Sequence, residues 1–151
     1  MTAQAIITGL ASVEALIAGL STGQCFDETP DAVEMELPVV LNIISGIPEI
    51  VRSAGQGLRL TTYEILAQML CAPPGTDLPT GEAVARPYFS KFITKLDRNR
   101  TLAGSCADSE VVSAKYGEIK LNAATPGHLG IVFTIRATEE ESGVLFSSTS
   151  T

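Results

Sequence analysis

Apolar residues near the N-terminus recur at helical spacing. The steps between them are four, three, four and three residues, at Ile6, Leu10, Val13, Ile17 and Leu20. This spacing places the apolar side chains on one face of an amphipathic helix. We predict that helix over residues 3–20, ended by the Gly- and Ser-containing stretch that begins at Gly19.

The next apolar run predicts a buried strand. β-branched and aliphatic residues follow Pro38 and continue through Ile44, a composition typical of strands. Gly46 and Pro48 then interrupt the run. Because both residue types break regular structure, we predict a loop over residues 46–57.

Two longer segments occupy the middle of the chain. Residues 58–70 combine β-branched residues with a stretch that could form a helix by propensity alone, and we predict a strand. A Pro- and Gly-rich loop is predicted over 72–79 and a helix over 81–99, with Pro87 in its first turn, where the missing N–H costs nothing. The apolar positions of this helix share one side: Ala85, Phe89, Phe92, Ile93 and Leu96.

The last third of the chain is rich in strand patterns. We predict strands over 110–116 and 118–121, separated by a turn at Gly117, and a further turn over 122–127. A strand over 129–138 has the clearest alternation in the chain. Its apolar positions are Leu129, Ile131, Phe133, Ile135 and Ala137.

The order of these elements predicts the fold. Glu139–Glu141 are expected to end the last strand, and residues 142–151 to form a flexible C-terminal tail. Helix, two strands, helix and three strands indicate one α+β domain over residues 1–141. We predict a mostly antiparallel or mixed sheet of about four to five strands with the two main helices packed on one face.

The composition and net charge of the chain argue against specific binding of nucleic acid. The 151 residues carry a formal net charge of −7, and such an acidic chain is repelled by a phosphate backbone unless its basic residues cluster. The nearest cluster has helical spacing: Arg86, Lys91, Lys95, Arg98 and Arg100. We interpret it as a solvated helix face and predict no specific nucleic-acid binding.

The cysteines and the apolar segments indicate a reducing compartment. Cys25, Cys71 and Cys106 are odd in number and lack CxxC spacing, which argues against a disulfide framework or a zinc site. The N-terminal segment lacks a positive region and contains Glu14, so it matches neither a signal peptide nor a membrane span. We therefore expect free thiols and a protein made in a cytoplasm.

Motifs for catalysis are weak. His128 is the one histidine and lies in a turn, without a partner that the sequence reveals. Gly55-Gln-Gly57 lacks the Lys-Ser/Thr ending of a phosphate-binding loop. Glu34 and Glu36 alternate along an extended stretch, and a solvated strand edge accounts for them. We predict no catalytic, cofactor or metal site.

The second half of the chain carries a recognisable arrangement. Residues 86–104 indicate a helix that ends in Asn-Arg-Thr-Leu-Ala-Gly, and Leu129–Ile135 form a closing strand that leads into acidic residues. With residues 115–119 between them and the 36–41 strand upstream, this arrangement resembles the tail terminator (tail completion) proteins of long-tailed bacteriophages. The family phrase has glycine where this chain has Ala103.

The resemblance implies an assembly function. Such a protein forms a ring, usually hexameric, that caps the tail tube, stops its polymerisation and joins it to the head. Its partners would be further copies of itself, the tail tube protein and a head completion or connector protein. DNA would pass through without specific binding and no membrane would be involved. The chain would not be an enzyme, and would belong to the tail or neck of a virion assembled in the host cytoplasm.

Roles within such a ring follow from position. The strands at 109–116 and 129–138 would form its scaffold. Loops and termini would dock partners, because loops carry function while a sheet holds position: residues 46–57, 71–80 and 139–151. Within the polar tail, the candidate docking residues are Val144, Leu145 and Phe146, an apolar anchor that would order on binding.

Two other functions remain open. One is another neck or head–tail connector protein of the same kind of particle. The other is a small bacterial α+β enzyme or ligand-binding domain. The second would need a cluster of polar residues near one end of the sheet, for which the candidates are His128, Cys106 and Tyr116.

Overall fold

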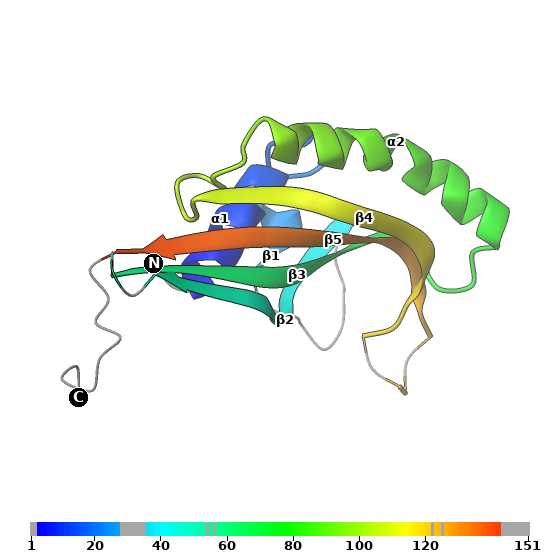
Figure 1. Ribbon diagram of the computed structural model, residues 1–151. Helices are drawn as coiled ribbons and strands as arrows, with labels where there is room; N and C mark the ends of the chain where they lie inside the picture. The colour runs from blue at the N-terminus through cyan, green and yellow to red at the C-terminus, as the bar shows by residue number, and fades with distance from the viewer. Residues whose placement is uncertain are drawn as a thin grey trace.

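The protein is a five-stranded mixed sheet with two α-helices packed against it (Figure 1). The computed structural model describes residues 3–27, 36–53, 55, 57–121, 123–124 and 126–142. In chain order the elements are α1 (Ala3–Glu14), a 3-10 turn η1 (Thr22–Gln24), β1 (Cys25–Phe26), β2 (Val39–Ser53), β3 (Leu58–Ala72), α2 (Leu78–Asp97), β4 (Asp108–Ile119) and β5 (His128–Glu141). The predicted α+β class is confirmed.

The strand order places the two longest pairings at the centre. The sheet runs β1-β2-β3-β5-β4, with β1 parallel to β2 and all other neighbours antiparallel. β1 contacts β2 only at Val40 and Leu41, so the rest of β2 lies at one free edge and β4 lies at the other.

Alternation on β5 builds the core as predicted. Its alternate residues from Leu129 to Ala137 are buried, and Phe133 lies at their centre. The ring of Phe92 on α2 stacks on Phe133 with centroids 3.9 Å apart, and Phe89 meets the same ring edge-on at 6.3 Å. These contacts attach α2 to the central strand.

The first helix is shorter than predicted. α1 ends at Glu14 and not at residue 20, and the chain continues in tight turns in which Leu16 and Ile17 donate to carbonyls three residues back, both at 3.0 Å. Ile17 and Leu20 remain buried, because these turns preserve the direction of the apolar stripe. Gly19 has φ +99°, and a Cβ there would lie 2.5 Å from the hydroxyl oxygen of Tyr88.

The predicted loop over 46–57 is wrong for its first eight residues, because β2 extends to Ser53. Gly46 and Pro48 are accommodated at two register shifts against β3, between Ile44 and Gly46 and between Gly46 and Glu49. A proline without an N–H is tolerated at a free edge, where no further strand requires that donor.

α2 also differs from its predicted start. It begins at Leu78, where the Asp77 side chain caps it by accepting the Thr80 N–H at 3.2 Å, and Pro79 occupies the first turn. Pro87 lies inside the helix, contrary to the prediction, and it is exposed. Water can therefore reach the carbonyl that lacks the proline N–H.

The last part of the sheet has two strands and not three. β4 is continuous from Asp108 to Ile119, and Gly117 pairs with Gly130 where a turn was predicted. β5 continues through Glu141 because Arg59 forms an ion pair with Glu141 and the Tyr63 hydroxyl donates to Glu139 at 3.2 Å. The acidic run therefore belongs to the sheet, while the predicted strand over 58–70 is confirmed as β3.

The Phe92–Phe133 stack predicts unequal costs for two neighbouring substitutions. Phe92→Ala should lower the free energy of unfolding by about 3–5 kcal/mol, since it opens a cavity under α2. Phe89→Ala is the matched control, and it should cost clearly less because Phe89 is only half-buried. Urea denaturation measures both. Equal losses for the two variants would contradict this account of the core.

Candidate functional site

Of the docking segments predicted from the sequence, one lies outside the described residues and the others form mostly helix or strand. Val144, Leu145 and Phe146 lie outside the described residues, as do all other residues of the predicted tail after Ser142. The remaining predicted docking segments are largely regular structure: 46–53 is β2, 71–72 is β3, 78–80 is α2 and 139–141 is β5.

Apolar side chains are exposed along the outer half of β2. We name Ile47, Ile50 and Val51 the β2 edge patch; their exposed fractions are 43–48%. They are uncovered because β1 protects only Val40 and Leu41. Ile50 and Val51 are consecutive in the strand, so their side chains lie on opposite faces of the sheet at this edge.

A second set of exposed apolar side chains lies on the other side of the sheet. We name Leu78, Val84 and Val112 the β4 side; their exposed fractions are 44–60%. Val112 lies at a register shift in the edge strand β4, and the Leu78 carbonyl accepts the Tyr116 hydroxyl at 2.9 Å. Exposed apolar side chains therefore lie toward both sides of the sheet, on β2 at one side and on α2 and β4 at the other.

A small polar groove of about 170 Å³ lies near the start of β4. Its lining residues come from four strands: Glu49, Thr62, Asp108, Ser109, Glu110, Arg136 and Thr138. Arg136 is paired in register with Glu64 on β3 and Glu110 on β4, so carboxylates flank this guanidinium. The lining contains no histidine or cysteine.

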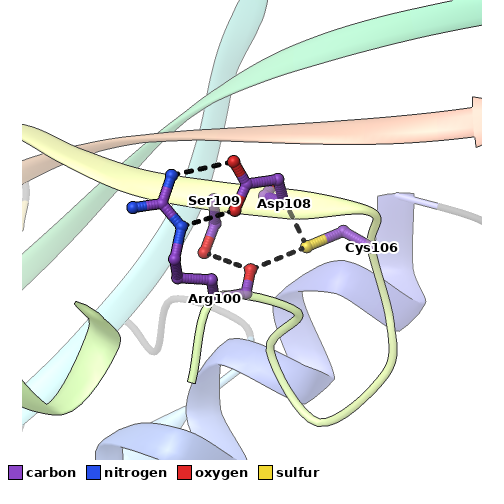
Figure 2. Close-up of polar contacts among 4 residues, drawn as sticks. All are labelled: Arg100, Cys106, Asp108 and Ser109. Carbon is purple, nitrogen blue, oxygen red and sulfur yellow. Dashed lines mark hydrogen bonds and ion pairs between the residues drawn. The ribbon is translucent and has the colours of Figure 1, made fainter. Parts of the chain in front are cut away.

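Figure 2 shows the network that joins the loop after α2 to β4. The Arg100 guanidinium binds the Asp108 carboxylate through two hydrogen bonds, 2.7 and 2.8 Å long, and holds the pKa of that carboxyl below its usual range. The buried Ser109 hydroxyl donates to the Arg100 carbonyl at 2.7 Å, and the Cys106 thiol points toward the same oxygen at 3.7 Å. The network fixes where β4 begins.

The loop held by this network contains two residues in the left-handed region. Leu102 has φ 49° and Ala103 has φ 60°. Leu102 is fully buried in the core, which compensates for its backbone strain. Ala103 is exposed and gains no such packing. Position 103 is also where the tail terminator phrase has glycine, the residue that this backbone favours.

A buried polar group that the sequence did not reveal joins α1 to the sheet. Glu14 is fully buried; its Oε1 accepts from Asn42 Nδ2 at 2.6 Å, and the same amide donates to the Phe26 carbonyl at 2.9 Å. Glu14 Oε2 and Asn42 Oδ1 have no hydrogen-bond partner among the described residues. Burial raises the pKa of Glu14 well above its ordinary value, so the neutral acid, which can donate a proton, suits this site.

A sequence signal for Glu14 does exist. The residue lies four positions after Leu10 and three before Ile17, inside the apolar stripe. A carboxyl group at such a position is either exposed to solvent or buried as the neutral acid. It is buried here because Asn42, which is distant in sequence, supplies a hydrogen-bond partner.

The thiols are free, as predicted, and poorly suited to nucleophilic chemistry. Burial raises the pKa of Cys25 and of Cys71 to about 12, with the Glu14 charge adding to the effect on Cys25. Burial and then Asp108 raise the pKa of Cys106 to about 11. Because the thiolate is the reactive form, these groups are largely protonated near neutral pH.

The polar residues of the enzyme alternative are not gathered at one place. His128 begins β5 opposite Ile119, while Cys106 precedes the other end of β4. The pKa of His128 is lowered by burial, and its Nδ1 has no partner within the part of the chain described. Tyr116 uses its hydroxyl to bind the Leu78 carbonyl.

Comparisons with known proteins assign no function to these residues. No family model matches this chain, and no curated protein matches it. Within the described ranges, no group of three or more His, Cys, Asp and Glu side chains could hold a metal ion. No described helix is long and apolar enough to span a bilayer.

Glu14 should make the stability of the fold depend on pH. A carboxyl whose pKa is raised on folding contributes stability below its unfolded pKa, about 4.3, and loses it as pH rises through the folded value. Within that window one proton changes the free energy of unfolding by up to about 1.4 kcal/mol per pH unit. Glu14→Gln should flatten this dependence in urea denaturation between about pH 5 and 8.

The control for this experiment is Glu36→Gln, which removes an exposed carboxylate away from Glu14's buried site and should leave the difference between pH values as it is in the native chain. Cys25 is the titratable neighbour that senses the Glu14 charge, and its pKa of about 12 keeps it protonated throughout the range. Parallel curves for the native chain and Glu14→Gln would disprove a neutral buried acid.

Ala103 should gain stability from glycine. Ala103→Gly relieves a left-handed backbone and should raise the free energy of unfolding by about 1 kcal/mol. Ala83→Gly is the opposite control, because Ala83 is an exposed helical residue and its replacement should cost about 1 kcal/mol. Thermal or urea unfolding of both variants measures the difference. A loss at position 103 equal to that at position 83 would refute the assigned backbone.

Proposed function

We propose that this chain is a virion assembly protein, a tail terminator that forms a ring, caps the tail tube, stops its growth and joins it to the head. It acts through surfaces and not through catalysis. Its partners are further copies of itself, the tail tube protein and a head connector. The observation that carries the proposal is the pair of different apolar surfaces, the β2 edge patch and the β4 side.

A cyclic ring uses heterologous contacts, in which one patch of each subunit meets a different patch of the next. A chain that needs such a contact must expose two unlike surfaces that face in different directions. The β2 edge patch lies on one outer strand, while the β4 side consists of Val112 on the opposite edge strand and Leu78 and Val84 on α2, so the two sets can alternate around a ring. Burying their apolar side chains would supply the driving force.

The β2 edge favours a side-chain contact over strand pairing. Pro48 lacks an N–H, and the two register shifts around Gly46 bend the strand. Such features discourage another strand from adding to an edge. Exposed apolar side chains on an edge that resists backbone pairing support a specific docking surface there.

Two further features support the tail terminator reading. Ala103, where the family phrase has glycine, has a left-handed backbone, which glycine adopts more readily than alanine. The net charge of −7 suits a channel through which DNA passes without being held.

The proposal is tested by the absolute mass of the purified protein. Light scattering over a concentration series, with negative-stain images of the same fractions, should find a closed ring of the native chain. Ile50→Asp with Val51→Asp should shift the mass to the monomer, because it places charges in the β2 edge patch. Both positions are exposed, so the melting temperature should change little.

Ala123→Asp is the control, since it adds the same charge at an exposed site away from both apolar surfaces. It should leave the ring intact. A native chain that is monomeric at every concentration would count against self-assembly and favour the neck connector. A ring that survives the double substitution would exclude the β2 edge patch as the contact.

A further inference from the structure

A groove lies between the turn after α1 and the outer side of α2. Its volume is about 340 Å³, and its lining is Leu16, Ile17, Ala18, Ser90, Lys91, Thr94 and Lys95. Leu16 is the most exposed large apolar side chain among the described residues, at 62%. The groove therefore combines an apolar part from one segment with two lysines from α2.

The two lysines have no ion-pair partner within the described residues. The neighbouring basic residues Arg86 and Arg100 are engaged with Glu82 and Asp108. Lys91 instead lies 5.0 Å from the centre of the Tyr88 ring. The lysines beside this groove are thus available to an acidic ligand that also carries an apolar group.

The C-terminal part of the sequence has that chemistry. Glu139–Glu141 are followed, after Ser142 and Gly143, by the apolar triplet Val144–Phe146. The order of charge and apolar side chains complements the groove, which offers ammonium groups beside an apolar surface. Glu140 is exposed at the end of β5, whereas Glu141 already pairs with Arg59.

The length of chain limits how far the triplet extends from the end of β5. Phe92, next to Lys91, stacks on Phe133, and Glu141 lies eight residues further along β5. At 3.3 Å per residue that separation is about 26 Å. Phe146 is five residues beyond Glu141 and can extend about 18 Å at most. The extended arm therefore falls short of the level of Phe133 in its own sheet, whereas a neighbouring copy can present its groove closer to the end of β5.

We propose that the Val144–Phe146 segment of one copy occupies the Leu16–Lys91–Lys95 groove of the next copy. Glu140 of the donating copy faces the lysines of the receiving copy. Each subunit then contributes one arm and one groove, a heterologous contact that repeats around a ring. This inference rests on the proposed ring, because it requires neighbouring copies in a fixed order.

Binding is tested with a fluorescent peptide of residues 139–151. The receiving protein is the full chain with Val144→Ser, Leu145→Ser and Phe146→Ser, so that its own arm does not compete. The peptide should bind, and Lys91→Glu with Lys95→Glu should weaken binding at least about tenfold. Leu16→Asp should do the same. Lys115→Glu is the control: it changes an exposed lysine on β4 and should leave affinity unchanged.

Exchange between copies is tested by mixing two defective full-length variants. One carries the three serines and an intact groove, and the other carries Lys91→Glu, Lys95→Glu and an intact arm. A complex that forms on mixing, measured by light scattering, supports exchange. Peptide binding without any complex on mixing would overturn the exchange of arms between copies.

The remaining outcomes separate this inference from the proposed ring. A ring that persists in the triple-serine variant, with no peptide binding, overturns the arm contact and leaves the ring standing. A native monomer that nevertheless binds the peptide overturns the ring and keeps the groove as a docking site for an acidic, apolar segment. If the peptide binds and the groove substitutions do not weaken its binding, the Leu16–Lys91–Lys95 groove is not the binding site.

Discussion

The architecture depends on the antiparallel pairing of β3 with β5, which extends from Ala72 opposite Leu129 to Arg59 opposite Glu141. Both strands present apolar side chains to the same face, and that face must be removed from water. The stack of Phe92 on Phe133 meets this requirement for α2, while α1 covers the neighbouring part of the sheet. β2 and β4 are then left as the outer strands, and their positions decide which apolar side chains stay exposed.

The sequence predicted the central elements better than the outer ones for a physical reason. A strand with one buried face must alternate, and from Ile131 to Ala137 every second residue of β5 is buried. Gly46 and Pro48 are breakers in a central strand, but β2 carries them at a free edge through register shifts. Edge position depends on the order of strands in space, so local sequence could not reveal that the predicted loop is a strand. Pro87 is similar, because its exposure makes it tolerable inside α2.

The candidate site was predictable only in part. Ala103 was visible in the sequence, but its left-handed φ was not, because alanine does not signal that conformation. Glu14 could be placed on the apolar stripe but not assigned a role, since its partner Asn42 is 28 residues away. The β2 edge patch depends on how little β1 covers, which no local pattern encodes. Val144, Leu145 and Phe146 stay a prediction from sequence.

Charge sets a constraint on any assembly of this chain. Copies that each carry −7 repel one another, and this repulsion grows as a ring closes. In the proposed ring, the apolar contacts between the β2 edge patch and the β4 side would therefore have to exceed the repulsion. Salt screens exposed charges beyond about 8 Å at physiological ionic strength, which relieves the net repulsion but also weakens lysine–glutamate contacts at the groove. The two kinds of contact thus respond oppositely to salt, so the proposed ring would depend on the apolar surfaces for its stability and on the charged arm for the order of its subunits.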